Sequence, residues 1–133
     1  MTTTGRCLCK ATTYGFDGEM AWQGHCHCES CRRNCSSGMV SFFGAPRAGF
    51  RWTGQVTGKY ESSPGVHRHF CTTCGTPMAY DGDWDKVNIH LYAASLDDPA
   101  AYQPTFHTFH EEKLPWVVLG DGLPTHEEFG GVT

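Results

Sequence analysis

The sequence contains no long apolar run. No segment approaches the roughly 20 apolar residues that a membrane-spanning helix needs, and the first ten residues, MTTTGRCLCK, have no apolar core of a secretory signal. Repeats and low-complexity tracts are also missing. The formal net charge is only −4, with a pI of about 6.0, which argues against nucleic-acid or anionic membrane partners. We therefore expect a cytoplasmic protein that binds neither nucleic acid nor membranes.

The chain is long enough for one ordinary hydrophobic core. It has 133 residues, of which 39% are hydrophobic and 13% aromatic, so we expect a single domain over residues 1–133. Large side chains should fill the core of such a small domain. We assign this role to the pair Phe42-Phe43 and to four tryptophans: Trp22, Trp52, Trp84 and Trp116.

Glycine and proline divide the chain into short segments that alternate between apolar and polar residues, a pattern typical of strands. The expected strands cover residues 11–16, 39–45, 50–54, 66–70 and 86–94. One short helix is expected from Glu29 to about Asn34, with a further helical turn near residues 100–103. Asp97-Asp98-Pro99 reads as a capped turn. The predicted fold is mainly β.

Cysteine, in contrast, is abundant, with 8 residues. In a reducing compartment, clustered cysteines are more often metal ligands or catalysts than disulfide partners. Their spacing agrees, because closely spaced cysteines bond awkwardly to each other but suit a tetrahedral ion. The clusters are a C-x-C of Cys7 and Cys9, a C-x-C-x-x-C of Cys26, Cys28 and Cys31, and a C-x-x-C of Cys71 and Cys74, with Cys35 outside them.

A structural zinc site normally has four protein ligands, whereas a catalytic site keeps three and leaves one position open. The two cysteine pairs together supply four thiolates for a closed site, and the remaining cluster supplies three. The sequence therefore predicts a structural zinc on Cys7, Cys9, Cys71 and Cys74, and an open site on Cys26, Cys28 and Cys31.

The same motifs resemble a known family. They are Gly5-Arg6-Cys7-Leu8-Cys9, the segment from Cys26 to Arg33, Phe70 to Thr76, Ser95 to Pro99, and Lys113-Leu114-Pro115-Trp116. Together they are similar to the glutathione-dependent formaldehyde-activating (GFA) family, which also includes centromere protein V. The resemblance implies a small zinc-binding β fold like that of a Rab exchange factor, with two zinc ions per chain on the ligand sets given above.

The resemblance also implies a zinc-dependent carbon-sulfur lyase. Zinc on Cys26, Cys28 and Cys31 would hold a thiol such as glutathione as a thiolate beside an aldehyde, giving an S-hydroxymethyl thiol. The expected partners are thus a small-molecule thiol and formaldehyde or a related aldehyde. Arg32 and Arg33 would bind the carboxylates of the thiol, although a solvated basic pair explains them equally well.

Two positions depart from the family pattern: Lys10 stands where many relatives have glycine, and Cys35 follows the basic pair. Helical offsets would allow Cys35 to close the second site with Cys28 and Cys31. A closed site would favour a zinc-stabilised protein-binding module, and a reactive Cys35 beside Cys31 a redox sensor. We predict instead an exposed Cys35 thiol near an open zinc.

The histidines leave several roles open. His25 and His27 adjoin the predicted ligands, where hydrogen bonds to sulfur or replacement ligation are both plausible. His107 and His110 form an H-x-x-H without another ligand nearby in sequence, and we interpret them as a surface or core pair.

Overall fold

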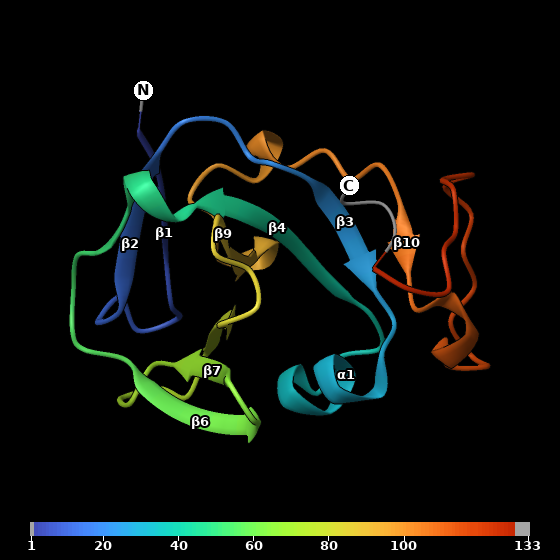
Figure 1. The fold of residues 1–133 in the computed structure, drawn as a ribbon, viewed down its shortest axis with the longest axis horizontal. Helices are drawn as coiled ribbons and strands as arrows, with labels where there is room; N and C mark the ends of the chain where they lie inside the picture. The colour runs from blue at the N-terminus through green and yellow to red at the C-terminus, as the bar shows by residue number, and fades with distance from the viewer. Residues whose placement is uncertain (1, 130–133) are drawn as a thin grey trace.

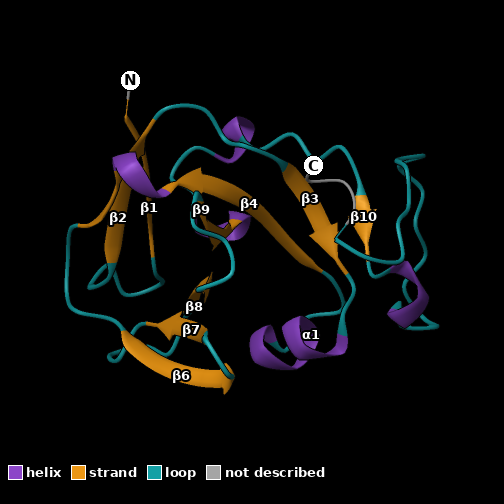
Figure 2. Ribbon diagram, in the orientation of Figure 1, coloured by secondary structure: helices purple, strands orange, loops and turns teal. Residues whose placement is uncertain are grey.

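The computed structural model describes residues 2–129, which form two β-sheets and one α-helix (Figures 1 and 2). The larger sheet has the strand order β10-β3-β4-β9-β8-β7-β6 and the smaller one β1-β2-β5. The large-sheet strands are β3 (Gln23–Cys26), β4 (Val40–Pro46), β6 (Gly58–Ser63), β7 (Val66–Phe70), β8 (Pro77–Gly82), β9 (Asn88–Tyr92) and β10 (His107–Thr108). The others are β1 (Thr2–Arg6), β2 (Thr13–Asp17) and β5 (Phe50–Trp52).

The helical elements are short. The α-helix α1 covers Glu29–Cys35 and comes shortly after β3 in the chain. It lies in the lower part of the molecule in Figure 1. Four 3-10 turns complete the described part: η1 (Arg47–Gly49), η2 (Ala93–Ser95), η3 (Pro99–Ala101) and η4 (His110–Glu112). Within residues 2–129 there is no helix with the length and apolarity to cross a bilayer.

The prediction of a mainly β fold is confirmed. All five predicted strands are present, as β2, β4, β5, β7 and β9, and the predicted helix is α1. The turn expected at residues 100–103 begins one residue earlier, at Pro99, and Asp98 caps it by accepting a hydrogen bond from the amide of Ala100. The pattern did not predict β1, β3, β6, β8 or β10. Of these, β1 and β6 are largely polar and exposed, β10 has two residues, and β3 and β8 are largely buried but lack a clear apolar-polar alternation.

Neighbouring strands run antiparallel except for the edge pair β3 and β10, which is parallel. This pair joins segments 82 residues apart and places His107 opposite His25. The last strand thus brings the region after residue 100 against the segment that carries the central cysteines.

The main core contains fully buried side chains from both sheets, including Phe16, Phe43, Met78 and Leu91. Gly5 in β1 is required for this packing, because a Cβ there would lie 2.2 Å from the ring of Tyr14. That close approach lets the Tyr14 hydroxyl reach Ser95 at 2.8 Å. The β1-β2 hairpin is thereby fixed against the large sheet.

The aromatic prediction is correct for Phe42, Phe43 and Trp22, which are buried, and Trp52 packs against the core. It is wrong for Trp84 and Trp116, which are 57% and 69% exposed. Trp84 lies in the turn between β8 and β9, where its indole N–H donates to the Tyr80 hydroxyl. The size of a tryptophan side chain alone therefore did not determine its burial.

A half-buried ion pair beside the core predicts a measurable dependence of stability on pH. Asp81 accepts one hydrogen bond from the guanidinium of Arg47 at 2.8 Å and another from the imidazole Nε2 of His69 at 2.9 Å. His69, with Arg47, lowers the pKa of Asp81 from 3.8 to about 2. Because the folded-state pKa is lowered, this stabilisation is present above pH 3.8 and is lost as the pH falls towards 2.

Replacing Asp81 with asparagine should lower the free energy of unfolding by about 2 kcal/mol at neutral pH, since each pKa unit corresponds to about 1.4 kcal/mol. Urea unfolding of both proteins at pH 7 measures this difference. Equal stability at pH 7 would show that the ion pair contributes nothing net.

Candidate metal centres

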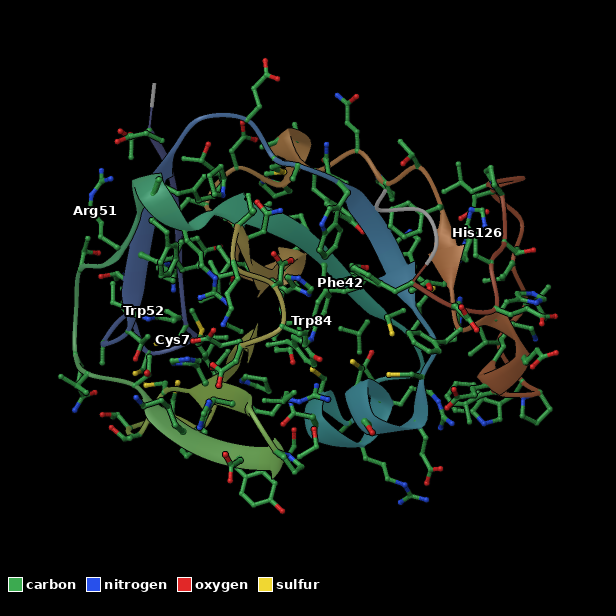
Figure 3. All side chains as sticks on the ribbon, in the orientation of Figure 1. Cys7, Phe42, Arg51, Trp52, Trp84 and His126 are labelled. Atoms are coloured by element: carbon green, nitrogen blue, oxygen red, sulfur yellow. The ribbon has the colours of Figure 1, made fainter. Side chains whose placement is uncertain are left out.

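The first cysteine cluster joins two turns that are far apart in sequence. Cys7 and Cys9 lie in the turn between β1 and β2, and Cys71 and Cys74 in the turn between β7 and β8. Their four sulfur atoms all lie within 4.8 Å of one another. In Figure 3, Cys7 is at the lower end of the β1-β2 hairpin, close to β7. The fold therefore brings together the four cysteines that were predicted to share one site.

The sulfur geometry suits a tetrahedral ion. Cys7 Sγ lies 3.7 Å from Cys9 Sγ, which lies 3.8 Å from Cys71 Sγ. With zinc-sulfur bonds of about 2.3 Å, a regular tetrahedron has edges of about 3.8 Å. These two sulfur-sulfur distances match the separation that a zinc ion would require, and no pair is joined as a disulfide.

Local hydrogen bonds support negative charge on the sulfurs of Cys7, Cys71 and Cys74. The amides of Thr12 and Thr73 donate to Cys7 Sγ and Cys71 Sγ at 3.2 and 3.4 Å. Hydrogen bonding by Thr76 lowers the pKa of Cys74 to about 5. Because metals bind the thiolate and not the thiol, these contacts favour the ligating form.

Lys10 shows the consequence of a departure from the family pattern. It follows Cys9 with a φ of 74°, in the left-handed region that glycine occupies without steric cost. The turn that positions Cys7 and Cys9 therefore keeps a conformation suited to glycine, although lysine occupies it.

The second cluster forms where β3 passes into α1. The sulfur atoms of Cys26, Cys28 and Cys31 lie within 4.8 Å of one another. Cys28 is the N-cap residue of α1, and its sulfur accepts a hydrogen bond from the amide of Cys31 at 3.3 Å. Cys28 is therefore both the N-cap of α1 and a potential ligand, because the capping hydrogen bond places its sulfur beside residue 31.

Cys35 is not part of this cluster. It ends α1, is half-buried, and lies beside Asn34, whose side-chain amide reaches the Tyr92 hydroxyl at 3.2 Å. Burial raises the pKa of the Cys35 thiol. The prediction of an exposed thiol is therefore wrong, because Cys35 packs against the core cluster that includes Val40 and Tyr92.

Arg68 is the important residue that the sequence interpretation missed. It lies in β7, is only 5% exposed, and its Nη1 is 3.4 Å from Cys31 Sγ and 3.3 Å from the Tyr92 hydroxyl. Its guanidinium also lies over the Tyr80 ring, 4.8 Å from the centroid. In the alternating pattern of β7, Arg68 lies on the same face as the apolar Val66. This position was a sequence signal that Arg68 is buried.

A cavity of about 360 Å³ opens on the three thiols. Its volume is within the range of small-molecule sites. Phe42 and Trp84, both labelled in Figure 3, form part of its wall. The described residues that line it are Cys26, Cys28, Ser30, Cys31, Phe42, Ser63, Arg68, Tyr80, Trp84, His90, Phe109, Glu112 and Phe129.

Arg32 and Arg33 lie outside this lining. Arg33 is exposed and pairs with Glu29 at 2.7 Å, one turn earlier in α1. Arg32 donates from Nε to the carbonyl of His27 at 3.1 Å. Their predicted contact with a substrate carboxylate stays a prediction, and Arg68 is the cation nearest the sulfurs among the lining residues.

A larger cavity, of about 690 Å³, has Tyr92 in its lining. Cys35, Arg6 and Asp97 are among its lining residues, but the thiols of the second cluster are not. The position of the sulfurs, and not cavity size, therefore identifies the smaller cavity as the candidate reactive site.

The neighbouring histidines face each other. His27 Nε2 lies 2.9 Å from His107 Nδ1, whereas His27 Nδ1 is buried without a hydrogen-bond partner among the described residues. His25 Nδ1 lies 2.9 Å from the Ser41 hydroxyl. The expected hydrogen bonds from His25 or His27 to sulfur are not formed within residues 2–129, and His107 pairs with His27 and not with His110.

Comparison with known proteins places this geometry in a family. The described fold is similar to the crystal structure of a Rhodobacter sphaeroides protein, with a TM-score of 0.56 and 18% identity over 92% of this chain and 98% of that one. A protein of Schizosaccharomyces pombe named as an uncharacterized lyase is 38% identical over 76 residues. That match covers 57% of this chain and 55% of the yeast protein, so the chain spans about half the length of this curated relative.

The family described as "Glutathione-dependent formaldehyde-activating enzyme" matches residues 2–112. This range contains both cysteine clusters, Arg68 and most of the cavity lining. The chain belongs to the glutathione-dependent formaldehyde-activating enzyme family.

Proposed function

We propose that the protein is a zinc-dependent carbon-sulfur lyase that forms or cleaves the adduct of glutathione with formaldehyde or a related aldehyde. The observation that carries this proposal is a cluster of three thiols, and not four, facing a cavity. Three ligands leave one position for a substrate atom. Family membership and the lyase name of the yeast relative support the same reaction class.

In the proposed reaction, the thiol sulfur adds to the carbonyl carbon of the aldehyde. One carbon-sulfur bond forms, the carbonyl π bond breaks, and the thiol proton is transferred to the hydroxymethyl oxygen. The reverse reaction is the lyase direction. Cys26, Cys28 and Cys31 would hold the zinc ion, and its positive charge would favour the thiolate form of an incoming thiol at neutral pH.

Arg68 compensates the charge that this site accumulates. Three thiolates around one divalent ion carry a net negative charge, which is costly in a buried position. The Arg68 guanidinium donates to Cys31 Sγ and is held in place by hydrogen bonds to Ser62 and Tyr92. We assign it a positioning and electrostatic role towards the ligand set.

The cavity walls separate the reacting atoms from bulk water. Phe42, Phe109, Phe129 and Trp84 provide apolar surface around the thiols, and Ser30 and Ser63 provide hydroxyl groups. Such a mixture suits a small polar thiol with a compact aldehyde. We assign the other cluster, Cys7, Cys9, Cys71 and Cys74, to a structural zinc, which gives two zinc ions per chain.

The test of this function is a rate comparison, because thiols add to formaldehyde without any enzyme. Two-dimensional exchange NMR with ¹³C-formaldehyde and glutathione measures interconversion of the free and bound aldehyde. The zinc-loaded protein should raise the exchange rate in proportion to its concentration. A rate equal to that of glutathione alone, at protein concentrations that show two bound zinc ions, would exclude this activity.

Replacing Cys35 with serine should leave two zinc ions per chain and an unchanged exchange rate, because Cys35 lies outside the three-thiol cluster. Elemental analysis and the same NMR assay measure both quantities. Glutathione binding that appears only in Cys35→Ser would instead show that Cys35 closes the site in the parent protein. That result would favour a zinc-stabilised binding module over an enzyme.

A further inference from the structure

A third group of potential ligands lies on the far side of β3 from the reactive thiols. The parallel pairing of β3 with β10 places His25 directly beside His107. The loop after residue 118 adds Asp121, whose Oδ2 lies 2.8 Å from His107 Nε2. One ligand atom from each of the three residues lies within 4.8 Å of the other two.

Each of these side chains is oriented by a second hydrogen bond. His25 Nδ1 lies 2.9 Å from the Ser41 hydroxyl, and His107 Nδ1 lies 2.9 Å from His27 Nε2. Asp121 accepts a hydrogen bond from the amide of Leu123 on its other oxygen, at 3.1 Å. Outer partners of this kind fix the ring orientation and tautomer of metal-binding histidines.

We propose that His25, His107 and Asp121 form a third metal site, for a divalent first-row transition metal. Two imidazoles with one carboxylate suit zinc, cobalt, nickel or ferrous iron better than calcium or magnesium, which prefer oxygen ligands alone. The Asp121 side chain is 40% exposed, whereas His107 is fully buried. The remaining coordination positions therefore face solvent beside the carboxylate.

This site is separate from the thiol cluster although His25 and Cys26 are adjacent in sequence. Successive residues of a strand point to opposite faces of the sheet. Cys26 lines the cavity with Arg68 and Tyr80, whereas His25 faces Ser41 and the ring of His107, with centroids 4.9 Å apart. The two faces of β3 thus present ligands of different chemical preference.

A metal on this site would hold the segment after residue 118 against the large sheet. The backbone of His107 already accepts a hydrogen bond from the amide of His126 and donates one to the carbonyl of Pro124, at 2.8 Å each. The same segment continues to Phe129, which lines the reactive cavity. The third metal would therefore stabilise one wall of that cavity without contacting the thiols.

Cobalt titration of protein that already carries two zinc ions tests the proposal. We expect a third equivalent of Co²⁺ with weak visible absorption and without the intense near-ultraviolet bands of cobalt-thiolate bonds. Equilibrium dialysis gives its affinity, and elemental analysis confirms that both zinc ions remain. The melting temperature should rise with Co²⁺ concentration, because the ion binds only the folded state.

Two substitutions assign the ligands. Asp121→Asn removes a charged ligand and should weaken cobalt binding by at least the roughly 10- to 100-fold that loss of an outer partner costs, and Ser41→Ala should weaken it within that range. Asp83→Asn, at another exposed carboxylate, is the matched control and should change nothing. The proposal is overturned by the absence of a third equivalent in the parent protein, or by equal affinity in Asp121→Asn.

Discussion

Replacing Cys74 with serine is expected to prevent stable folding. Cys74 and its three partners join the β1-β2 turn to the β7-β8 turn, and the Cys9 and Cys71 sulfurs that meet there are 62 residues apart in sequence. A structural zinc in such a site contributes on the order of 10 kcal/mol to folding. This is comparable to the whole stability of a small domain, about 5–15 kcal/mol. Far-UV circular dichroism and thermal unfolding should show loss of the cooperative transition.

Cys35→Ser provides the matched control for this experiment, because it removes a half-buried thiol that belongs to neither cluster. It should fold and melt nearly as the parent protein does. The chelated parent protein should behave like Cys74→Ser, since both lack the ion. An unchanged melting temperature in Cys74→Ser would contradict the structural role of this cluster.

The cysteine clusters could be predicted from sequence because ligand spacing is a local property. A C-x-C or C-x-x-C turn brings its own sulfurs together whatever the rest of the chain does. Counting ligands then gave one group of four thiols and one group of three. The fold brings the members of each group together. The five strands found by alternation were also local patterns, each with apolar or β-branched residues of its own.

The environment of the clusters could not be predicted in the same way, because it depends on pairing between distant segments. Arg68 approaches Cys31 only because the fold brings β7 beside a cysteine 37 residues earlier in the sequence, with the Arg68 side chain on the buried face of the strand. His107 meets His25 only through the parallel edge strand β10, a two-residue element without a sequence signal. Helical periodicity likewise placed Cys35 near the ligands without showing that it would pack against the core.

The two thiol clusters differ in their surroundings. The first lies between two hairpin turns and has backbone amides as its main hydrogen-bond donors. The second lies at the start of a short helix, faces a cavity and has the buried cation Arg68 beside it. A closed, amide-supported cluster suits a structural ion, and an open cluster beside a cation suits a reactive one. Separate substitutions should distinguish the two roles.

Replacing Cys28 with serine should remove the second zinc ion and reduce the aldehyde exchange rate to that of glutathione alone, while the fold persists. The cluster joins residues only five positions apart, from Cys26 to Cys31, so the ion closes no long loop of the chain. Elemental analysis should give one zinc ion per chain in place of two. Thermal unfolding should remain cooperative, in contrast to Cys74→Ser.

Cys31→Ser should abolish the same activity but cost more stability than Cys28→Ser. Cys31 is buried and its sulfur accepts a hydrogen bond from Arg68, a charged residue that is only 5% exposed. Losing one partner of a buried charged group costs about 1–3 kcal/mol, and Arg68 keeps its bonds to Ser62 and Tyr92. Urea unfolding of both variants measures this difference. If both variants unfold as completely as Cys74→Ser, the second zinc is structural, and the proposed catalytic role of the three-thiol cluster is contradicted.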